Sequence, residues 1–165
     1  MFCVSDSMGK IIAIVNQKGG VGKTTTAINL ASALSDTGKF VLLVDLDPQG
    51  NATSGLGIDY QNLSQGLYHS LSGQARLHDI IQNTAHAGLR VAPATQDLAG
   101  ASVELVNETN RESKLLDVLS EVLHAYDYII IDCPPSLGIL TLNGLFAADH
   151  ILIPVQAEYY ALEGL

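Results

Sequence analysis

A glycine-rich string constrains the fold of this chain more than any other feature. Residues 18–25 read Lys-Gly-Gly-Val-Gly-Lys-Thr-Thr, just after the apolar run of residues 10–15 and just before a segment with helical spacing. Glycines adopt backbone angles that other residues avoid, so the chain can turn sharply and bring successive N–H groups to phosphate oxygens. Strand, glycine-rich turn and helix in this order predict a phosphate-binding loop.

Two side chains of the loop add chemistry that N–H groups lack. Lys23 carries a mobile ammonium that can reach the β and γ phosphates, and the Thr24 hydroxyl can ligate Mg²⁺. A flexible Gly/Lys surface loop is the alternative, which the flanking strand and helix patterns disfavour. The predicted nucleotide-binding residues are Lys18, Gly19, Gly20, Val21, Gly22, Lys23, Thr24 and Thr25.

The string departs from the general pattern G-x-x-x-x-G-K-[ST], because Gln17 stands where the first glycine belongs. A second lysine, Lys18, stands at the entrance of the loop. In this respect the string resembles the deviant loop of the ParA/MinD class of ATPases, to which the nitrogenase iron protein also belongs. The resemblance implies that Lys18 reaches across a nucleotide-sandwich dimer to the partner's phosphates and acts there like an arginine finger.

Two acids follow the next buried-strand pattern, residues 40–44. Asp45 and Asp47 are two residues apart, so on an extended segment their carboxylates share one face before Pro48 turns the chain. In open α/β sheets ligands bind at the carboxyl ends of strands, so one acid can support Mg²⁺ while the other orients the attacking water. An Asp-Pro turn with solvated acids is the alternative. The stretch also resembles the first switch region of partition ATPases, which implies that Asp47 positions the water.

A third acid, Asp132, ends a strand pattern in which three isoleucines run into a carboxylate. We predict that it is the Walker B acid and holds a Mg²⁺-bound water, although a capping Asp after a buried strand is the alternative. Pro134 and Pro135 then force an extended exit that prepares a second switch loop. The predicted catalytic residues are Lys18, Lys23 and Asp47, and the predicted metal residues are Thr24, Asp45 and Asp132.

Composition excludes several classes of protein. A chain of 165 residues with 47% hydrophobic residues indicates one globular domain. The net charge of -9 gives no overall basic footprint of a nucleic-acid binder. Cys3, Cys133 and the five histidines lack metal-ligand spacing. Without a signal-peptide pattern or a run of about 18 apolar residues, we expect a cytoplasmic protein.

Apolar periodicity predicts alternating strands and helices, and hence an α/β fold with a mostly parallel twisted sheet flanked by helices. We expect residues 1–9 to be a flexible tail and residues 10–165 to be the domain. Residues 52–90 name no chemistry. The predicted strands are 10–15, 40–44, 89–93, 126–132 and 150–155, and the predicted helices are 27–38, 63–71, 77–83, 97–106, 112–123 and 137–148.

The three motifs lie in the order found in ParA/Soj partition ATPases, and Asp-Pro-Gln-Gly-Asn at residues 47–51 resembles that branch specifically. The resemblance implies a P-loop NTPase of the deviant Walker A class. Family members are longer than this chain, so the resemblance also implies that the C-terminal strands of the sheet are missing here. It implies ATP and Mg²⁺ as cofactors, weak ATP hydrolysis and an ATP-dependent homodimer. It also implies a ParB-type centromere-binding partner, no membrane, and a nucleoid-associated protein that binds DNA non-specifically through its C-terminal part.

Three other classes stay open at this point. A MinD-like membrane-surface ATPase that regulates cell division would need a C-terminal amphipathic helix. An iron-sulfur electron carrier would need bridging cysteines, which Cys3 and Cys133 do not resemble. A metabolic kinase would need an acceptor pocket, which the motifs do not identify.

Overall fold

The computed structural model describes residues 9–157. Most of the predicted tail, residues 1–8, and the closing residues 158–165 lie outside this range. Gly9, which we also expected to belong to the tail, is buried. A Cβ at this position would lie 2.3 Å from the carbonyl oxygen of Tyr126, so the backbone of Gly9 is closely packed. This residue therefore packs as part of the domain.

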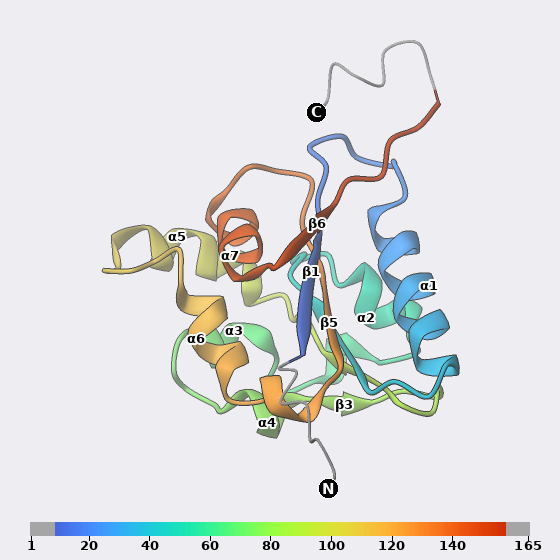
Figure 1. The fold of residues 1–165 in the computed structure, drawn as a ribbon. Helices are drawn as coiled ribbons and strands as arrows, with labels where there is room; N and C mark the ends of the chain where they lie inside the picture. Colours follow the sequence, from blue (N-terminus) through green and yellow to red (C-terminus); the bar gives the residue numbers. More distant parts are fainter. Residues whose placement is uncertain (1–8, 158–165) are drawn as a thin grey trace, which may run out of the picture.

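The described residues form one twisted six-stranded sheet, and the prediction of a mostly parallel sheet is confirmed (Figure 1). The strand order is β3-β4-β2-β5-β1-β6, and only the β3–β4 pair is antiparallel. The strands are β1 (Lys10–Ile14), β2 (Val41–Asp45), β3 (Gln82–Asn83), β4 (Leu89–Ala92), β5 (Tyr128–Asp132) and β6 (His150–Leu152). We call the carboxyl ends of the parallel strands the upper end and their amino ends the lower end.

Helices cover both faces of the sheet, with α1 and α2 on one face and α3, α5, α6 and α7 on the other (Figure 1). Short 3₁₀ turns occupy residues 60–62, 105–107 and 123–125. The α-helices are α1 (Lys23–Asp36), α2 (Asn51–Gly55), α3 (Leu67–Leu71), α4 (Leu77–Ile80), α5 (Leu98–Glu104), α6 (Lys114–Ser120) and α7 (Ile139–Ala147).

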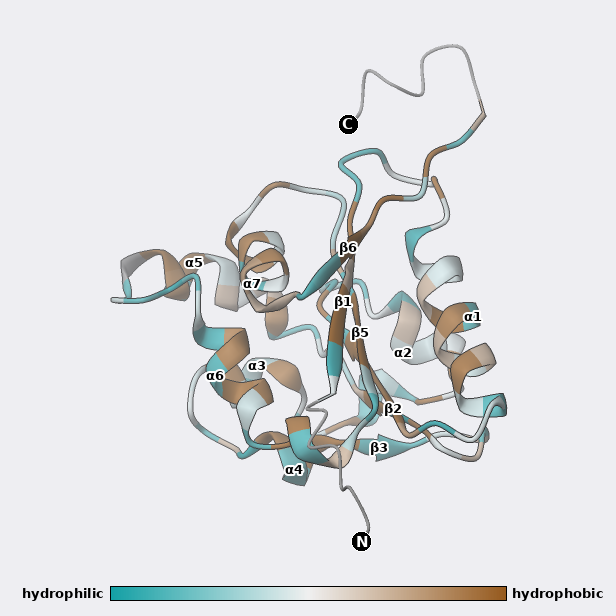
Figure 2. Ribbon diagram, viewed as in Figure 1, coloured by the Kyte–Doolittle hydropathy of each residue, from teal (hydrophilic) through white to brown (hydrophobic). Residues whose placement is uncertain are grey.

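Burial on both faces explains why the strands read as unbroken apolar runs. Ile129 and Ile131 of β5 pack with the α3–α7 side, whereas Ile130 packs with Ala27 and Ala31 of α1 on the other side. All three isoleucines are buried. Alternate side chains of a strand point to opposite faces, so only a sheet with two covered faces requires this pattern. Figure 2 shows the resulting hydrophobic band along β1 and β5.

Several predicted boundaries are wrong, for local reasons. The helix predicted over 77–83 ends at Ile80, because Gln82 and Asn83 pair with β4 instead. The strand predicted over 150–155 ends at Leu152, two residues before Pro154, which has no N–H to donate to a neighbouring strand. The five-residue helix α2 was not predicted.

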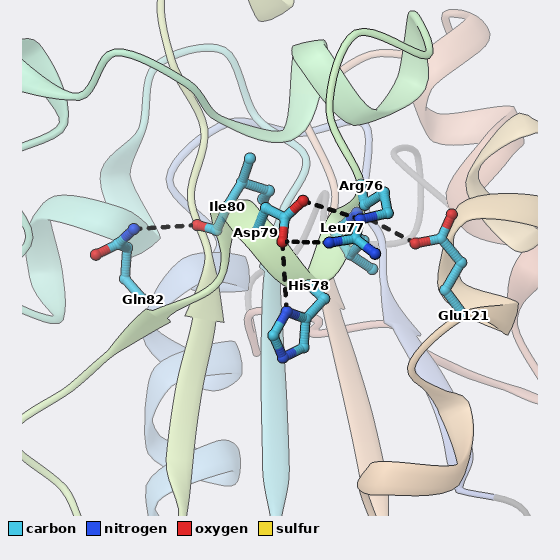
Figure 3. Close-up of polar contacts among 7 residues, drawn as sticks. All are labelled: Arg76, Leu77, His78, Asp79, Ile80, Gln82 and Glu121. Carbon is cyan, nitrogen blue, oxygen red and sulfur yellow. Dashed lines mark hydrogen bonds and ion pairs between the residues drawn. The ribbon is translucent and has the colours of Figure 1, made fainter.

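Polar contacts fix the weakly patterned segment around α4 at the lower end of the sheet (Figure 3). The Arg76 guanidinium donates to both carboxylate oxygens of Asp79, at 3.0 and 3.1 Å. Glu121 accepts a 3.3 Å hydrogen bond from the backbone N–H of Leu77, and the Gln82 amide donates to the Ile80 carbonyl at 3.2 Å. The Glu121 contact satisfies a backbone donor at the start of α4 that the helix itself leaves open.

Candidate nucleotide-binding site

The glycine-rich string connects the upper end of β1 to the first turn of α1. Gly20 and Gly22 have φ angles of 74° and 90°, which residues with a Cβ rarely adopt. Gly22 is the N-cap of α1, and α1 has no side-chain cap and no acid in its first turn. The first N–H groups of this helix therefore point to a place where an anion would complete their hydrogen bonding.

The space in front of the loop is open. A Cβ built on Gly19, Gly20 or Gly22 would meet no atom within 4 Å. A hollow of about 420 Å³ lies there, within the size range of small-molecule sites. Its lining residues are Gly19, Gly20, Gly22, Lys23, Thr24, Thr25, Asp47, Asn51 and Pro135. The structure thus brings most of the predicted nucleotide-binding residues around one cavity.

The two lysines of the string take different positions. Lys23 is 7% exposed, and its ammonium donates to the Lys18 carbonyl at 3.1 Å, so it lies across the loop beside the hollow. Lys18 is exposed and does not line the hollow. Its ammonium donates to the side-chain oxygen of Gln156 at 3.4 Å. Val21 does not line the hollow either.

Two of the three predicted acids lie side by side, because β2 and β5 are neighbours and Asp45 is in register with Asp132. Asp45 is buried, and one of its oxygens accepts from the Thr53 N–H at 2.7 Å and the Thr53 hydroxyl at 2.6 Å. The other oxygen accepts from the Asp47 N–H at 3.2 Å. Burial raises the pKa of Asp45 to about 6, although the Thr53 and Asp47 hydrogen bonds lower it. Asp45 thus anchors α2 and the Asp47 turn to the sheet.

Asp132 is less well hydrogen-bonded than Asp45. It is 0% exposed, and neither carboxylate oxygen makes a hydrogen bond of ordinary geometry with any of residues 9–157. Burial raises its pKa to about 7, the nearby Thr24 hydroxyl and Lys23 ammonium lower it, and the charges of Asp45 and Asp47 raise it. A buried carboxylate without a partner is costly, so this group fits a bound cation or a cation's water shell.

Asp47 lies between this buried pair and the hollow. It is 8% exposed, and one oxygen accepts from the Gln49 N–H at 3.0 Å. Asn51 and Pro135 line the hollow beside it, although our sequence reasoning did not assign them to the site. The signal for Asn51 was its place directly after a glycine, Gly50, which caps the start of α2 with a φ of 65°. Thr53, the partner of Asp45, had no signal in the sequence.

Donor chemistry at the site fits Mg²⁺ held together with phosphates. Within residues 9–157, no group of three or more His, Cys, Asp or Glu side chains could hold a metal ion. Mg²⁺ is commonly bound by one or two protein oxygens together with substrate phosphates and water. The Thr24 hydroxyl beside Asp132 supplies such a set.

Within residues 9–157, no helix is long and apolar enough to span a membrane.

Comparison with known proteins identifies the family. The AAA domain family matches residues 9–165. The chain is 58% identical to the chromosome partitioning protein ParA of Myxococcus xanthus, covering 96% of this chain and 56% of that protein. It is 61% identical to the sporulation initiation inhibitor protein Soj of Bacillus subtilis, covering 96% of this chain and 62% of that protein. The chain therefore spans less than two thirds of the length of these relatives.

A solved structure has a similar fold. The chain superposes with a TM-score of 0.93 on a Mycobacterium smegmatis protein named cobyrinic acid a,c-diamide synthase, crystallised with ADP and magnesium. The two are 43% identical, and the match covers 96% of this chain and 64% of that one. The chain thus belongs to the AAA domain family, and over most of its length it is similar to the ParA and Soj proteins.

Proposed function

We propose that this chain is the nucleotide-binding part of a ParA-type switch that binds ATP and Mg²⁺ and hydrolyses ATP slowly. The observation that carries the proposal is the pairing of an open hollow at the first turn of α1 with a buried carboxylate, Asp132, that makes no hydrogen bond of ordinary geometry in the described part of the chain. One feature fits an anion and the other fits a cation. Mg²⁺-ATP supplies both.

Each site residue has a role in this proposal. The loop N–H groups and the Lys23 ammonium would hold the phosphates, the Thr24 hydroxyl would ligate the metal, and Asp132 would hold the metal through a water. Asp45 supports this network through Thr53 and the Asp47 turn. Asp47 orients the attacking water from the edge of the hollow. When bound, Mg²⁺ would neutralise charge on the phosphates.

The switch itself depends on pairing of two subunits. Lys18 is exposed at the rim of the loop, where it could reach the phosphates of a facing subunit and add charge only in the dimer. The ATP dimer would bind DNA non-specifically at the nucleoid, in the cytoplasm, through sequence beyond this chain. A ParB-type partner would stimulate hydrolysis and reopen the dimer. The output is a change in DNA affinity between two states, and residues 10–165 form the domain that switches.

Calorimetry of Mg²⁺-ATP binding to this chain tests the proposal, followed by sizing with and without ATP. Binding that is lost in Lys23→Ala, together with an ATP-dependent dimer in the unsubstituted chain, would support it. Folded protein that binds no nucleotide would overturn it.

Two other functions give different results in simple assays. A MinD-like regulator would bind phospholipid vesicles in the presence of ATP through a C-terminal amphipathic helix, whereas a partition ATPase would bind DNA. A cobyrinic acid a,c-diamide synthase, as the M. smegmatis protein is named, would consume ATP only when cobyrinic acid is present. Slow turnover with ATP and Mg²⁺ alone, accelerated by DNA and a ParB-type protein, would favour the partition switch.

A further inference from the structure

The segment that follows β6 lies along the entrance of the glycine-rich loop. The Val15 N–H donates to the Leu152 carbonyl at 3.1 Å, which extends the β1–β6 ladder. The buried Asn16 side chain then donates to the Pro154 carbonyl at 2.8 Å and accepts from the Lys18 N–H at 2.8 Å. Main-chain and side-chain bonds therefore keep the two segments together up to Lys18.

The next contact uses both ends of one amide. The Gln156 side-chain oxygen accepts from the Lys18 ammonium at 3.4 Å, and its nitrogen donates to the Gly20 carbonyl at 3.2 Å. Gln156 is half-buried, whereas Lys18 is exposed. One residue from beyond β6 thus contacts both the loop backbone and the lysine that the proposed dimer needs.

The hydrogen bond between Gln156 and Lys18 is weak enough to break and re-form readily. An amide carries no net charge, and the bond to Lys18 is long and exposed to solvent, so it contributes little. A phosphate oxygen of a facing subunit would be a stronger acceptor for the same ammonium. Lys18 can therefore exchange the amide of its own subunit for a phosphate in another.

We propose that Gln156 is a positioning residue that holds Lys18 against its own loop in the nucleotide-free subunit and so sets the ATP concentration at which two subunits pair. This inference rests on the proposed function, and it adds a regulatory residue to the same site. Lys23 is restrained in a related way, since its ammonium contacts the Lys18 carbonyl. Both lysines are thus held by atoms of their own chain before nucleotide arrives.

Two substitutions at this position separate the proposal from a purely structural role. Gln156→Ala and Gln156→Glu both remove the nitrogen that donates to Gly20. They differ at the acceptor, because alanine removes it and glutamate replaces it with a carboxylate that holds an ammonium more strongly. We expect roughly two- to threefold less ATP for half-maximal pairing in Gln156→Ala, and an increase of at least that size in Gln156→Glu. Shifts in the same direction would overturn the proposal, because they would mean that Gln156 only anchors the loop.

Gln82 provides a matched control at the lower end of the sheet. It is also half-buried, and its amide also donates to a backbone carbonyl, that of Ile80, at 3.2 Å. Gln82→Ala and Gln82→Glu should leave the ATP concentration for pairing unchanged. Effects like those at Gln156 would mean that loss of an amide anchor anywhere changes pairing, and would count against the proposal.

A measurement without nucleotide keeps the contact testable by itself. In ¹⁵N NMR spectra of the nucleotide-free chain, the side-chain amide signals of Gln156 should shift when Lys18 is replaced by methionine, and those of Gln82 should not. If the Gln156 signals do not shift, the proposal is overturned, regardless of how ATP affects pairing. A chain that shows this shift but does not pair with ATP would instead overturn the proposed function and, with it, the role of Gln156 in pairing.

Discussion

The two ends of the sheet differ in how completely their polar groups are satisfied. At the lower end, protein groups pair with one another: Arg76 with Asp79, and Asp127 with both the Phe40 N–H at 2.8 Å and Lys39 at 3.5 Å. At the upper end, Asp45 is paired with Thr53, but Asp132 makes no hydrogen bond of ordinary geometry to the described residues and the first turn of α1 has no side-chain cap. Buried polar groups left open at one end of a sheet, beside a hollow, are what a ligand-binding end requires, and this difference between the ends supports the proposed site.

Loss of one lysine at each end should show the largest contrast. Lys23→Ala removes the ammonium beside the hollow, and we expect Mg²⁺-ATP affinity to fall about 100-fold or more, which is roughly 3 kcal/mol. Lys39→Ala removes a lysine that pairs only with Asp127 among the described residues, and affinity should not change. Calorimetry measures both. Equal losses would mean that net charge, and not position, controls binding.

The unpaired acid should make the stability of the empty protein depend on pH. The pKa of Asp132 is about 7 in the folded chain and near 3.8 when unfolded, so its contribution to stability is lost as pH rises from about 4 through 7. Asp45, with a pKa of about 6, acts in the same direction. We expect Asp132→Asn to raise the free energy of unfolding at pH 8 by on the order of 2 kcal/mol, and to weaken Mg²⁺-ATP binding.

Urea unfolding at pH 5 and pH 8 tests this prediction. The substituted chain should lose less stability between the two pH values than the original does. Asp127→Asn is the control, since Asp127 already has hydrogen bonds at the lower end. An Asp132→Asn chain that is less stable at pH 8 would contradict the interpretation of Asp132 as an unpaired buried charge.

Alanine substitutions of the two glycines at opposite ends of α1 should have a smaller effect on stability, and the effect should be equal at the two positions. Gly22 and Gly38 have φ angles of 90° and 83°, and a Cβ on either would meet no atom within 4 Å. Alanine at either position should therefore cost about 1 kcal/mol of stability from backbone strain alone. Only Gly22→Ala should also reduce ATP binding. If both variants bind ATP normally, the hollow does not hold the phosphates against the loop.

Removal of an exposed ion pair should have the smallest effect. Arg76→Ala leaves Asp79 in water, where a lost partner matters little. We expect a barely detectable fall in the midpoint of thermal unfolding and no change in nucleotide affinity. A clear loss of ATP binding would show that the two ends are coupled through the sheet.

Much of the upper end could be predicted from the sequence, because its chemistry lies in short contiguous strings. The order of strand, loop and helix located Lys23 and Thr24 in front of the hollow, and the rule for parallel sheets located Asp45 and Asp132 together. The roles of these residues remain proposals. What the sequence predicted was mainly where they lie.

The features that were missed depend on contacts between distant residues. Thr53 holds Asp45 only because α2, a helix of five residues, returns to the end of β2. Gln156 lies beside Lys18 only because β6 pairs with β1 at the edge of the sheet. Short helices have weak periodicity, and strand order across a sheet is not written in any local pattern.

The strand order also bears on how this chain can fold as it is made. β5 lies between β1 and β2, so these two strands, which are made first, never contact each other directly as a pair. A growing chain that has left the ribosome only as far as α6 still lacks the central strand. Until residues 128–132 emerge, the apolar edges of β1 and β2 have no neighbour between them, and during synthesis this is the interval of greatest exposure to aggregation and to chaperones.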